Sequence, residues 1–406
     1  MSPNEHPDRL RILIGCDTFA PDVNGAARFS ERLAAGLVER GHDVHIVAPA
    51  QRYRRYRAGT ETIEGQPMTV HRLPAVRWLP HDWLRFVWPW RAKHYARKVL
   101  SAVRPDAVHI QSHIVIGRGL ARIARQRGIP IVATNHVMAE NILDFTVMPP
   151  LVDKLVLKLA WDDAERTFKM ARAVTTPTRR AAEFLERTVD ITGVIPISCG
   201  IDRRNYRPDP MPRAQPRMLF VGRLTSEKRV NTTLRALARL VSEADPVRGA
   251  DGAPLDIQFD IVGGGDQGKH LEQLTRQLGL SDRVHFLGRV DDEQLIEYYR
   301  RASVFVIASI AELQSIATLE AMASGLPVIG ADAMALPHLV HDGENGYLFA
   351  PDDDEQLAAR IAAVLTAPHE EWLRMQRASL EGVEVHDITR TLDTFEALYR
   401  GEPIPE

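Results

Sequence analysis

The chain alternates between short, apolar, β-branched runs and longer stretches whose apolar residues have helical spacing. In the first half, helices are predicted at residues 26–40 and 119–127, between the apolar runs. The predicted strands cover residues 11–15, 44–49, 107–112 and 130–136. Strands that alternate with crossover helices form a parallel, doubly wound sheet. We therefore predict an α/β domain here.

The same alternation restarts after residue 216. The predicted strands cover residues 217–222, 257–263, 284–288, 303–309 and 327–332. The helices predicted between and after them cover residues 229–243, 267–278, 292–301, 319–324 and 355–366. The element order resembles that of the first half but the sequences differ, so we predict a second domain of similar size rather than an internal repeat.

A proline-rich stretch separates the two patterns. Residues 203–216, RRNYRPDPMPRAQP, contain four prolines and few apolar residues, which is typical of a linker. The expected domains are residues 1–202 and residues 217–383, and a helix at about 384–399 can pack back on the first domain. A chain of 406 residues is long enough for two such cores.

Composition places the chain among globular proteins. It is 45% hydrophobic and 26% charged with a formal net charge of −2, so bulk nucleic-acid binding is not indicated. Its two cysteines, Cys16 and Cys199, follow apolar runs and are interpreted as small buried residues rather than a disulfide, which fits a reducing cytoplasm. The first apolar run is too short for a signal sequence or a membrane span.

The small net charge hides a basic segment. Residues 51–104 carry twelve Lys and Arg against three acidic residues, and four of the six tryptophans fall within residues 78–90. Interfacial tryptophan beside cations suits an anionic membrane surface. The candidate membrane or acceptor contacts are Arg54, Arg55, Trp78, Trp83 and Trp88. The alternative is a helix pair that packs its aromatic residues inward.

Two strand ends carry charged groups suited to a phosphorylated ligand. Arg223 directly follows the strand at 217–222, and Lys228 lies five residues later. Open α/β sheets bind ligands at the carboxyl ends of their strands, and two cations there suit a diphosphate. The alternative is a pair of solvated loop cations.

The second strand end precedes SIAELQSIATLEAMASGLPVI. Its Glu312 lies in the predicted loop and Glu320 on the following helix, where carboxylates can accept hydrogen bonds from sugar and ribose hydroxyls. The amides at the helix start, residues 314–317, can take phosphate oxygens. Ordinary compensation of the helix dipole is the alternative for Glu312.

Together these motifs resemble a known family. GRLTSEK, the spaced Glu312 and Glu320, EAMASGLPVI and DGENGYLF are similar to the retaining family-four glycosyltransferases of GT-B fold, among them lipid mannosyl- and glucosyltransferases acting on phosphatidylinositol or glycosyl-diacylglycerol. The resemblance implies two Rossmann-like domains that face a cleft. It also implies that Arg223 and Lys228 neutralise the leaving diphosphate, that Glu312 contacts the hexose and that Glu320 holds the ribose.

The resemblance extends to further donor-side residues. Gly265 and Arg289 match the family's nucleotide-side loops, and Asn24 with Gly25 matches its first strand-to-helix turn. His136 matches the family's histidine beside the donor sugar. The chain departs from the family after Glu312. Many relatives have Gly-Phe-Gly directly after this glutamate, where this chain has Leu313-Gln314-Ser315. Gln314, Ser315 and Ile316 are the residues assigned to the phosphate loop.

The resemblance implies transfer of mannose or glucose, with retention, from a nucleoside diphosphate sugar to a lipid or lipid-linked acceptor. GDP-mannose is favoured over UDP-glucose on overall likeness. No metal or cofactor is expected, and the enzyme is expected to be peripheral on the inner face of the plasma membrane. The open alternatives are a soluble acceptor, an epimerase or phosphorylase of the same fold, an inactive nucleotide-binding module, and a membrane scaffold.

Two other motifs are set aside. Residues 263–268 fit a dinucleotide fingerprint, but the next strand ends in Gly288 and Arg289 rather than in an acid for a ribose. Residues 352–354, Asp-Asp-Asp, directly precede a helical pattern and are interpreted as a helix cap and first turn rather than a metal site.

Overall fold

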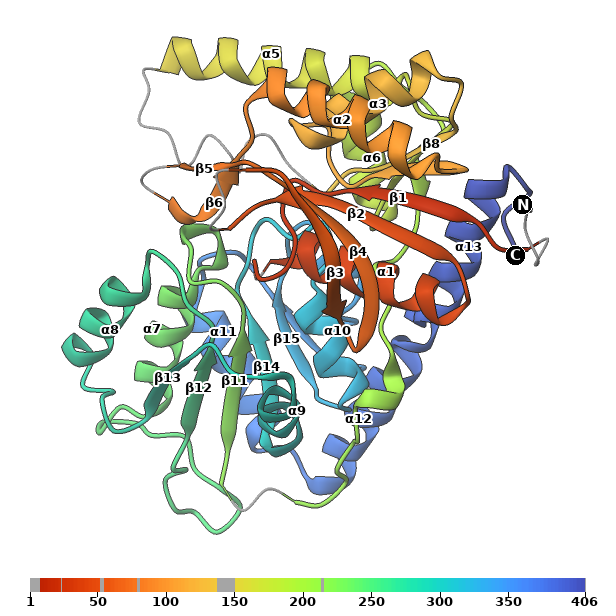
Figure 1. Cartoon of the computed structure of the whole chain (residues 1–406). Coiled ribbons are helices and arrows are strands. Elements are labelled where there is room, and N and C mark those ends of the chain that lie inside the picture. Colours follow the sequence, from red (N-terminus) through yellow and green to blue (C-terminus); the bar gives the residue numbers. More distant parts are fainter. Residues whose placement is uncertain are drawn as a thin grey trace. The chain divides into compact units, whose positions relative to one another are not determined.

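In this computed structural model the described residues are 8–22, 24–51, 55–78, 81–136, 150–212 and 215–405. The chain divides into two compact units (Figure 1). Unit 1 comprises Met1–Cys199 with Thr389–Glu406, and unit 2 comprises Gly200–Ile388. Both are α/β with a mainly parallel sheet, which confirms the predicted fold class.

Unit 1 is built on an eight-stranded sheet in the order β10-β9-β8-β7-β1-β2-β4-β3. All neighbours are parallel except β3 and β4. Its strands are β1 (Arg11–Gly15), β2 (Asp43–Pro49), β3 (Arg57–Ile63), β4 (Gln66–Leu73), β7 (Ala107–Ile110), β8 (Ile131–Thr134), β9 (Ala173–Thr176) and β10 (Ile195–Pro196). The helices are α1 (Gly25–Glu39), α2 (Pro89–Val103), α3 (Ile116–Gln126), α5 (Pro150–Phe168), α6 (Arg179–Thr188) and α13 (Ile388–Arg400).

Alternating side chains of β1 fill both faces of this sheet. Leu13 joins a core with residues of α2, α3, α5 and α6, and Figure 1 shows α2, α3 and α5 together on that face. On the other face α1 packs against α13, where the rings of Phe29 and Phe395 lie 5.8 Å apart. The approach is close at Gly36, where an added Cβ would lie 2.7 Å from a terminal methyl of Leu392, so that side chain would have to move. The C-terminal helix is therefore part of unit 1.

The described residues within 57–78 and 81–86 include strands that the sequence pattern did not predict. After β3 and β4, a separate two-stranded sheet pairs β5 (Val76–Trp78) with β6 (His81–Phe86). The alternative of a helix pair over the basic segment is therefore wrong, since among the described residues of this segment α2 is the one helix and the others form strands. The pattern was hidden because β3, RAGTETI, presents polar side chains at most positions.

Unit 2 has a six-stranded parallel sheet in the order β13-β12-β11-β14-β15-β16. Its strands are β11 (Arg217–Val221), β12 (Gln258–Val262), β13 (Val284–Gly288), β14 (Val304–Ile307), β15 (Val328–Ala331) and β16 (Gly346–Phe349). The helices are α7 (Val230–Leu240), α8 (Gly268–Gln277), α9 (Asp292–Arg301), α10 (Ile316–Ala323), α11 (Asp354–Leu365) and α12 (His369–Gly382).

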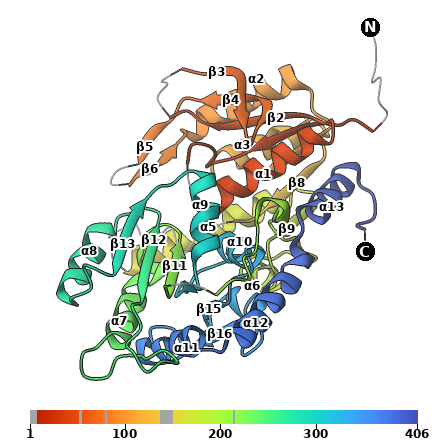
Figure 2. The ribbon, with the colours of Figure 1, turned by 90° about the horizontal axis from the view of Figure 1, so that it is seen from below.

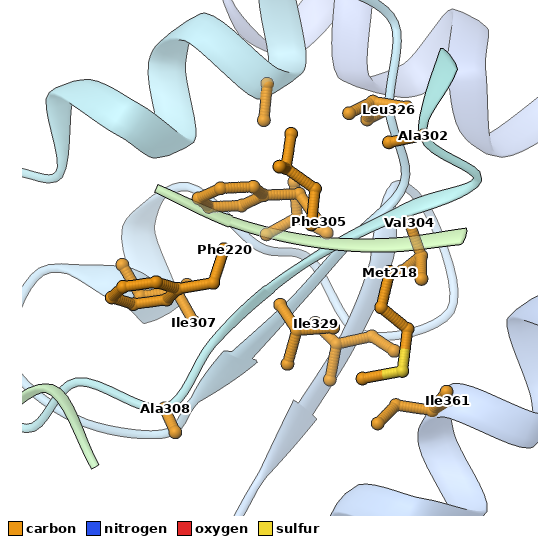
Figure 3. Close-up of a cluster of buried hydrophobic side chains, with 14 of the residues drawn as sticks. Met218, Phe220, Ala302, Val304, Phe305, Ile307, Ala308, Leu326, Ile329 and Ile361 are labelled. Atoms are coloured by element: carbon orange, nitrogen blue, oxygen red, sulfur yellow. The ribbon is translucent and has the colours of Figure 1, made fainter. Parts of the chain in front are cut away.

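Helices cover both faces of the second sheet. On one face α7 packs against both α8 and α11, as Figures 1 and 2 show, and α10 packs against α12 on the other. Figure 3 shows the apolar centre, where Met218 and Phe220 of β11 lie near Phe305 of β14 and Ile329 of β15. Burial of such aromatic and aliphatic side chains is the main term that stabilises the sheet. This core holds the loops at the strand ends in fixed positions.

The stretch predicted as a linker packs on unit 2. It includes a short 3₁₀ helix, Arg203–Asn205, and Tyr206 then joins the unit 2 core. Beyond Tyr206, the carbonyl of Asp209 accepts a hydrogen bond from the Gln376 side chain at 3.1 Å. The two chain crossings between the units lie at 199–200 and 388–389, and near them Ile201 exchanges backbone hydrogen bonds with His386 and Ile388.

Candidate active site

Arg223 and Lys228 occupy the loop that follows β11. Arg223 is largely buried, and loss of hydration lowers its pKa, while Glu227, Glu312 and Asp266 act in the opposite direction. A guanidinium remains charged under such conditions. A 3₁₀ turn, Ser226–Lys228, then brings the second cation back toward the sheet. This loop therefore presents two positive groups at the carboxyl end of a central strand.

The glycines after β12 allow this loop to pack closely. A Cβ on Gly263 would lie 1.9 Å from the carbonyl oxygen of Gly222, and one on Gly265 would lie 2.2 Å from that of Leu224. The φ of Gly263 is +126°, a further reason for glycine there. By contrast, Gly264 has no atom within 4 Å of an added Cβ. Loop packing thus accounts for the first two glycines of the dinucleotide-like spacing, whereas a Cβ at Gly268 would make only an ordinary contact, at 3.8 Å, with Leu224.

Glu312 lies in the loop after β14 and faces the cations. Its side chain pairs with Lys228, with Oε1 2.5 Å from Nζ, and only about a tenth of the carboxylate side chain is exposed. Two backbone bonds hold the loops in register: Ile310 donates to the carbonyl of Glu227, and Ala335 donates to that of Glu312, both at 3.1 Å. Since β11 and β14 are adjacent and parallel, the structure brings together Arg223, Lys228 and Glu312.

The next helix, α10, begins directly beyond this cluster. Ser315 is its N-cap and accepts hydrogen bonds from the amide and the hydroxyl of Thr318 at 3.3 and 2.8 Å. Gln314, Ser315 and Ile316 are all buried. The Ser315 side chain therefore caps the helix. An anion bound at these positions would be held by backbone amides.

Glu320 lies one turn into α10 and is 5% exposed. The Tyr299 hydroxyl of α9 donates to its Oε2 at 3.0 Å and lies 3.2 Å from the carbonyl oxygen of Ala317. Tyr299 is fully buried. The sequence pattern did not single out Tyr299, which lies in an ordinary amphipathic helix.

Arg289 lies further along the same edge. It follows β13, is exposed, and comes after Gly288, whose φ is +64°. Because all six strands are parallel, the residues that follow β13, β12, β11 and β14 meet at one edge of the sheet. Unit 2 thus places Arg289, Gly265, Arg223 and Glu312 along the expected ligand-binding edge.

In unit 1, Asn24 is the N-cap of α1. Its Oδ1 accepts from the amide of Ala27 at 2.9 Å and from the hydroxyl of Thr18 at 3.3 Å. Gly25, the first residue of the helix, is exposed. As with Ser315, the side chain caps the helix, and the amides at the helix start are the groups able to meet an anion.

His136 follows β8 and is held from two sides. Its Nε2 lies 2.9 Å from Oε1 of Gln111, and its ring packs on Phe29 with centroids 4.7 Å apart. Burial lowers the pKa of His136 to about 3, so the ring is neutral at pH 7. Behind Gln111 lies His109, whose pKa burial also lowers to about 3. Neither Gln111 nor His109 was singled out by the sequence.

The predicted membrane-contact residues are only partly described. Arg54 and the side chains of Trp78 and Trp83 lie outside the described residues, and Arg55 is exposed. Trp88 is 40% and its neighbour Trp90 65% exposed, and their rings stack with centroids 4.9 Å apart. Helix α2 also exposes four cations and contains no acidic residue. These cations are Arg91, Lys93, Arg97 and Lys98.

The Asp-Asp-Asp stretch is a helix start, as predicted. Asp353 is the N-cap of α11 and accepts from the amide of Gln356. Asp352 and Asp354 pair with Arg229 and Arg239. Cys16 and Cys199 are both buried free thiols, as expected.

Comparison with solved structures supports the fold. Sucrose-phosphate synthase from Thermosynechococcus elongatus superposes with a TM-score of 0.79 at 21% identity, covering 97% of this chain and 99% of that one. Anabaena HepE in complex with UDP and glucose gives 0.72 at 18% identity, covering 97% and 100%.

Curated relatives share more sequence. The GDP-mannose-dependent alpha-mannosyltransferase of Corynebacterium glutamicum is 28% identical, covering 92% of this chain and 85% of the relative. The alpha-monoglucosyldiacylglycerol synthase of Streptococcus pneumoniae is 24% identical, covering 88% and 79%. The D-inositol 3-phosphate glycosyltransferase of Acidothermus cellulolyticus is 27% identical, covering 85% and 78%.

Two family models divide the chain between them. The family described as Glycosyltransferase Family 4 matches residues 23–205, and Glycosyl transferases group 1 matches residues 202–380. The matches span both units and include every predicted site residue. The chain therefore belongs to the family-four glycosyltransferases of GT-B fold.

Proposed function

We propose that this enzyme transfers a hexose, mannose or glucose, from a nucleoside diphosphate sugar to a lipid or lipid-linked acceptor, with retention of configuration. The observation that carries the proposal is the cluster of Arg223, Lys228 and Glu312 at adjacent parallel strand ends, with Lys228 and Glu312 in direct contact. A cation pair beside a carboxylate suits a ligand that joins a diphosphate to a sugar hydroxyl.

The chemistry proposed for these groups is electrostatic. When the glycosidic bond breaks, negative charge develops on the leaving diphosphate, and Arg223 and Lys228 stabilise it together with the amides at the start of α10. Glu312, the carboxylate in contact with Lys228, accepts hydrogen bonds from the hexose hydroxyls, and Glu320 accepts them from the ribose. Because Arg223 and Lys228 supply two cationic groups for the diphosphate, we propose that no metal is needed.

Retention is proposed to proceed on one face of the sugar. The acceptor attacks from the side on which the diphosphate leaves, and a phosphate oxygen takes the acceptor's proton. Glu312 already pairs with Lys228, and Glu227 accepts a hydrogen bond from the Thr225 hydroxyl, so a covalent glycosyl intermediate of the glycosidase kind is not favoured.

The proposal of a lipid acceptor is supported by the exposed surface of α2 and by the relatives. The exposed Trp88 and Trp90 adjoin a helix face that carries four cations and no acid, which suits an anionic bilayer surface. No helix in the described part of the chain is long and apolar enough to cross a membrane. We therefore propose peripheral attachment on the inner face of the plasma membrane.

A donor panel tests the reaction. Purified protein is incubated with GDP-mannose, UDP-glucose, UDP-galactose or UDP-N-acetylglucosamine and with vesicles of anionic phospholipid and diacylglycerol, in EDTA. Nucleoside diphosphate release and lipid products are followed by mass spectrometry. We expect GDP-mannose to be consumed and a mannosylated lipid to form. Tight binding of UDP without response to GDP would overturn the choice of donor, and turnover only on soluble acceptors would overturn the lipid.

Vesicle binding tests the proposed membrane surface at Trp88 and Trp90 separately from the transfer reaction. The double variant Trp88→Ala/Trp90→Ala should bind anionic vesicles at least about tenfold more weakly, while Met211→Ala, which removes an exposed apolar side chain from unit 2, should bind as wild type. Equal binding by all three proteins would show that α2 does not contact the membrane.

A further inference from the structure

A hydrogen-bonded chain of buried side chains lies directly behind His136 in unit 1. It begins at Tyr399 of α13, whose hydroxyl lies 2.8 Å from Nδ1 of His109. The other ring nitrogen of His109, Nε2, lies 2.7 Å from the Thr134 hydroxyl. Gln111 stands between His109 and His136 and is only 3% exposed. The chain therefore joins the C-terminal helix to the candidate sugar-contacting histidine.

The two ends of the Gln111 amide have different neighbours. The amide nitrogen lies 3.4 and 3.5 Å from the two ring nitrogens of His109, both of which have shorter contacts to hydroxyls. The amide oxygen lies 2.9 Å from Nε2 of His136. An amide oxygen only accepts hydrogen bonds, so in this orientation of the Gln111 amide Nε2 of His136 is the donor and carries the proton.

The backbone fixes Gln111 in this position. Its amide donates to the carbonyl of Gly15 at 2.9 Å, at the end of β1, and it follows β7 in the middle of the sheet. The Phe29 ring also packs against the His136 imidazole, with centroids 4.7 Å apart and the ring planes tilted by 51°. The ring is therefore held by one hydrogen bond and one aromatic contact, which together restrict the direction of its remaining nitrogen, Nδ1.

We propose that Gln111 is a positioning residue that holds His136 as the neutral tautomer protonated on Nε2, so that Nδ1 is the nitrogen that accepts a hydrogen bond from a hydroxyl of the donor sugar. This inference rests on the proposed function for the role of Nδ1, but not for the tautomer. A neutral ring suits this task, because a protonated imidazole could only donate. His109, Thr134 and Tyr399 act through Gln111 by orienting its amide.

The tautomer can be measured without any activity. Protein labelled with ¹⁵N-histidine is examined by long-range proton–nitrogen spectra, and the His136 signals are identified by their loss in His136→Gln. We expect a protonated Nε2 and an unprotonated Nδ1 in wild type at pH 7. In Gln111→Met, which keeps similar volume without the acceptor, the two tautomers should mix. Gln126→Met, at the exposed end of α3, should leave the wild-type spectrum unchanged.

Kinetics tests the consequence. Gln111→Met should lower kcat/KM for the donor by about fivefold to tenfold, as expected for one lost hydrogen bond. Gln111→Glu places a carboxylate against Nε2 and favours the protonated ring, so its activity should fall as the pH drops from 8 to 6, where the wild-type profile stays flat. Thermal unfolding checks that both variants fold.

The outcomes separate the two proposals. A wild-type His136 protonated on Nδ1, or a tautomer unchanged in Gln111→Met, would overturn the positioning role. If the tautomer depends on Gln111 but every donor is inert, the positioning role stands and the proposed function fails. An active enzyme whose kinetics and pH profile ignore both Gln111 substitutions would overturn the link between the tautomer and the donor sugar.

Discussion

At the scale of single residues, several side chains of the site depend on a buried partner. The Tyr299 hydroxyl bonds Glu320, and its removal leaves a buried carboxylate with one donor fewer. We expect Tyr299→Phe to lower the free energy of unfolding by about 1–3 kcal/mol. Urea unfolding measures this change. If Glu320 also holds the ribose, KM for the donor should rise, because its carboxylate is no longer oriented.

Tyr298→Phe is the matched control for this substitution. Tyr298 is the neighbouring residue, only partly buried, and its ring keeps the contact with Arg301 whether or not the hydroxyl is present. Equal unfolding energies for the two variants would mean that the hydroxyl of Tyr299 has no special role.

Burial of His109 and His136 makes a specific prediction for acid stability. The pKa of each is about 3 in the folded chain, against an ordinary value of 6.5. The unfolded chain therefore binds more protons between these values, and stability is lost as the pH falls from about 6.5 toward 3, by up to about 1.4 kcal/mol per pH unit for each ring. Unfolding of His109→Gln should show a shallower dependence over this window.

The exposed His94 on α2 supplies the control for this pH series. His94→Gln should keep the steep wild-type slope. If His109→Gln and wild type lost stability in parallel down to pH 4, burial of the His109 ring would not be the cause of the acid sensitivity.

At the scale of elements, the loops that follow β11 and β12 approach each other closely, and two adjacent glycines, Gly263 and Gly264, test how much this approach matters. A methyl group at Gly263 would collide with the backbone of Gly222, whereas one at Gly264 meets nothing within 4 Å. We expect Gly263→Ala to destabilise unit 2 by at least about 2 kcal/mol, because backbone must move. Gly264→Ala should have little effect. Denaturant unfolding compares the two.

The loops also link stability with the site. Because Leu224 donates to the carbonyl of Gly264 and Gly222 to that of Val262, a displaced β12 loop would shift Arg223 as well. Gly263→Ala should therefore also weaken donor binding. Wild-type stability and binding in Gly263→Ala would show that the loops adapt without cost.

At the scale of the whole molecule, the sequence predicts most of the architecture. Runs such as RILIG and RMLFV are short, apolar and buried, so their strands could be located directly. The strands β3 and β4 escaped prediction because polar side chains on β3 pair within the sheet, as Glu61 does with the buried Arg72. Helix α12 also lay outside the prediction.

The candidate site, too, could be predicted only in part from the sequence. Arg223, Lys228 and Glu312 could be found because each lies in a local motif, and the fold then brings them together. Tyr299 could not, since its partner Glu320 is 21 positions away. The same holds for His109, which meets Tyr399 across 290 positions. Such contacts exist only after folding, and no local pattern records them.

The central claim is that the Arg223 cluster binds the diphosphate of a nucleotide sugar. Calorimetric titration with GDP and UDP tests it most directly, using wild type, Arg223→Ala, and Arg235→Ala as a control for an exposed arginine on α7. We predict that one nucleotide binds wild type and Arg235→Ala equally and binds Arg223→Ala about tenfold to a hundredfold more weakly, as for a lost charged hydrogen bond. Equal binding to all three proteins, or no binding to any, would contradict the account.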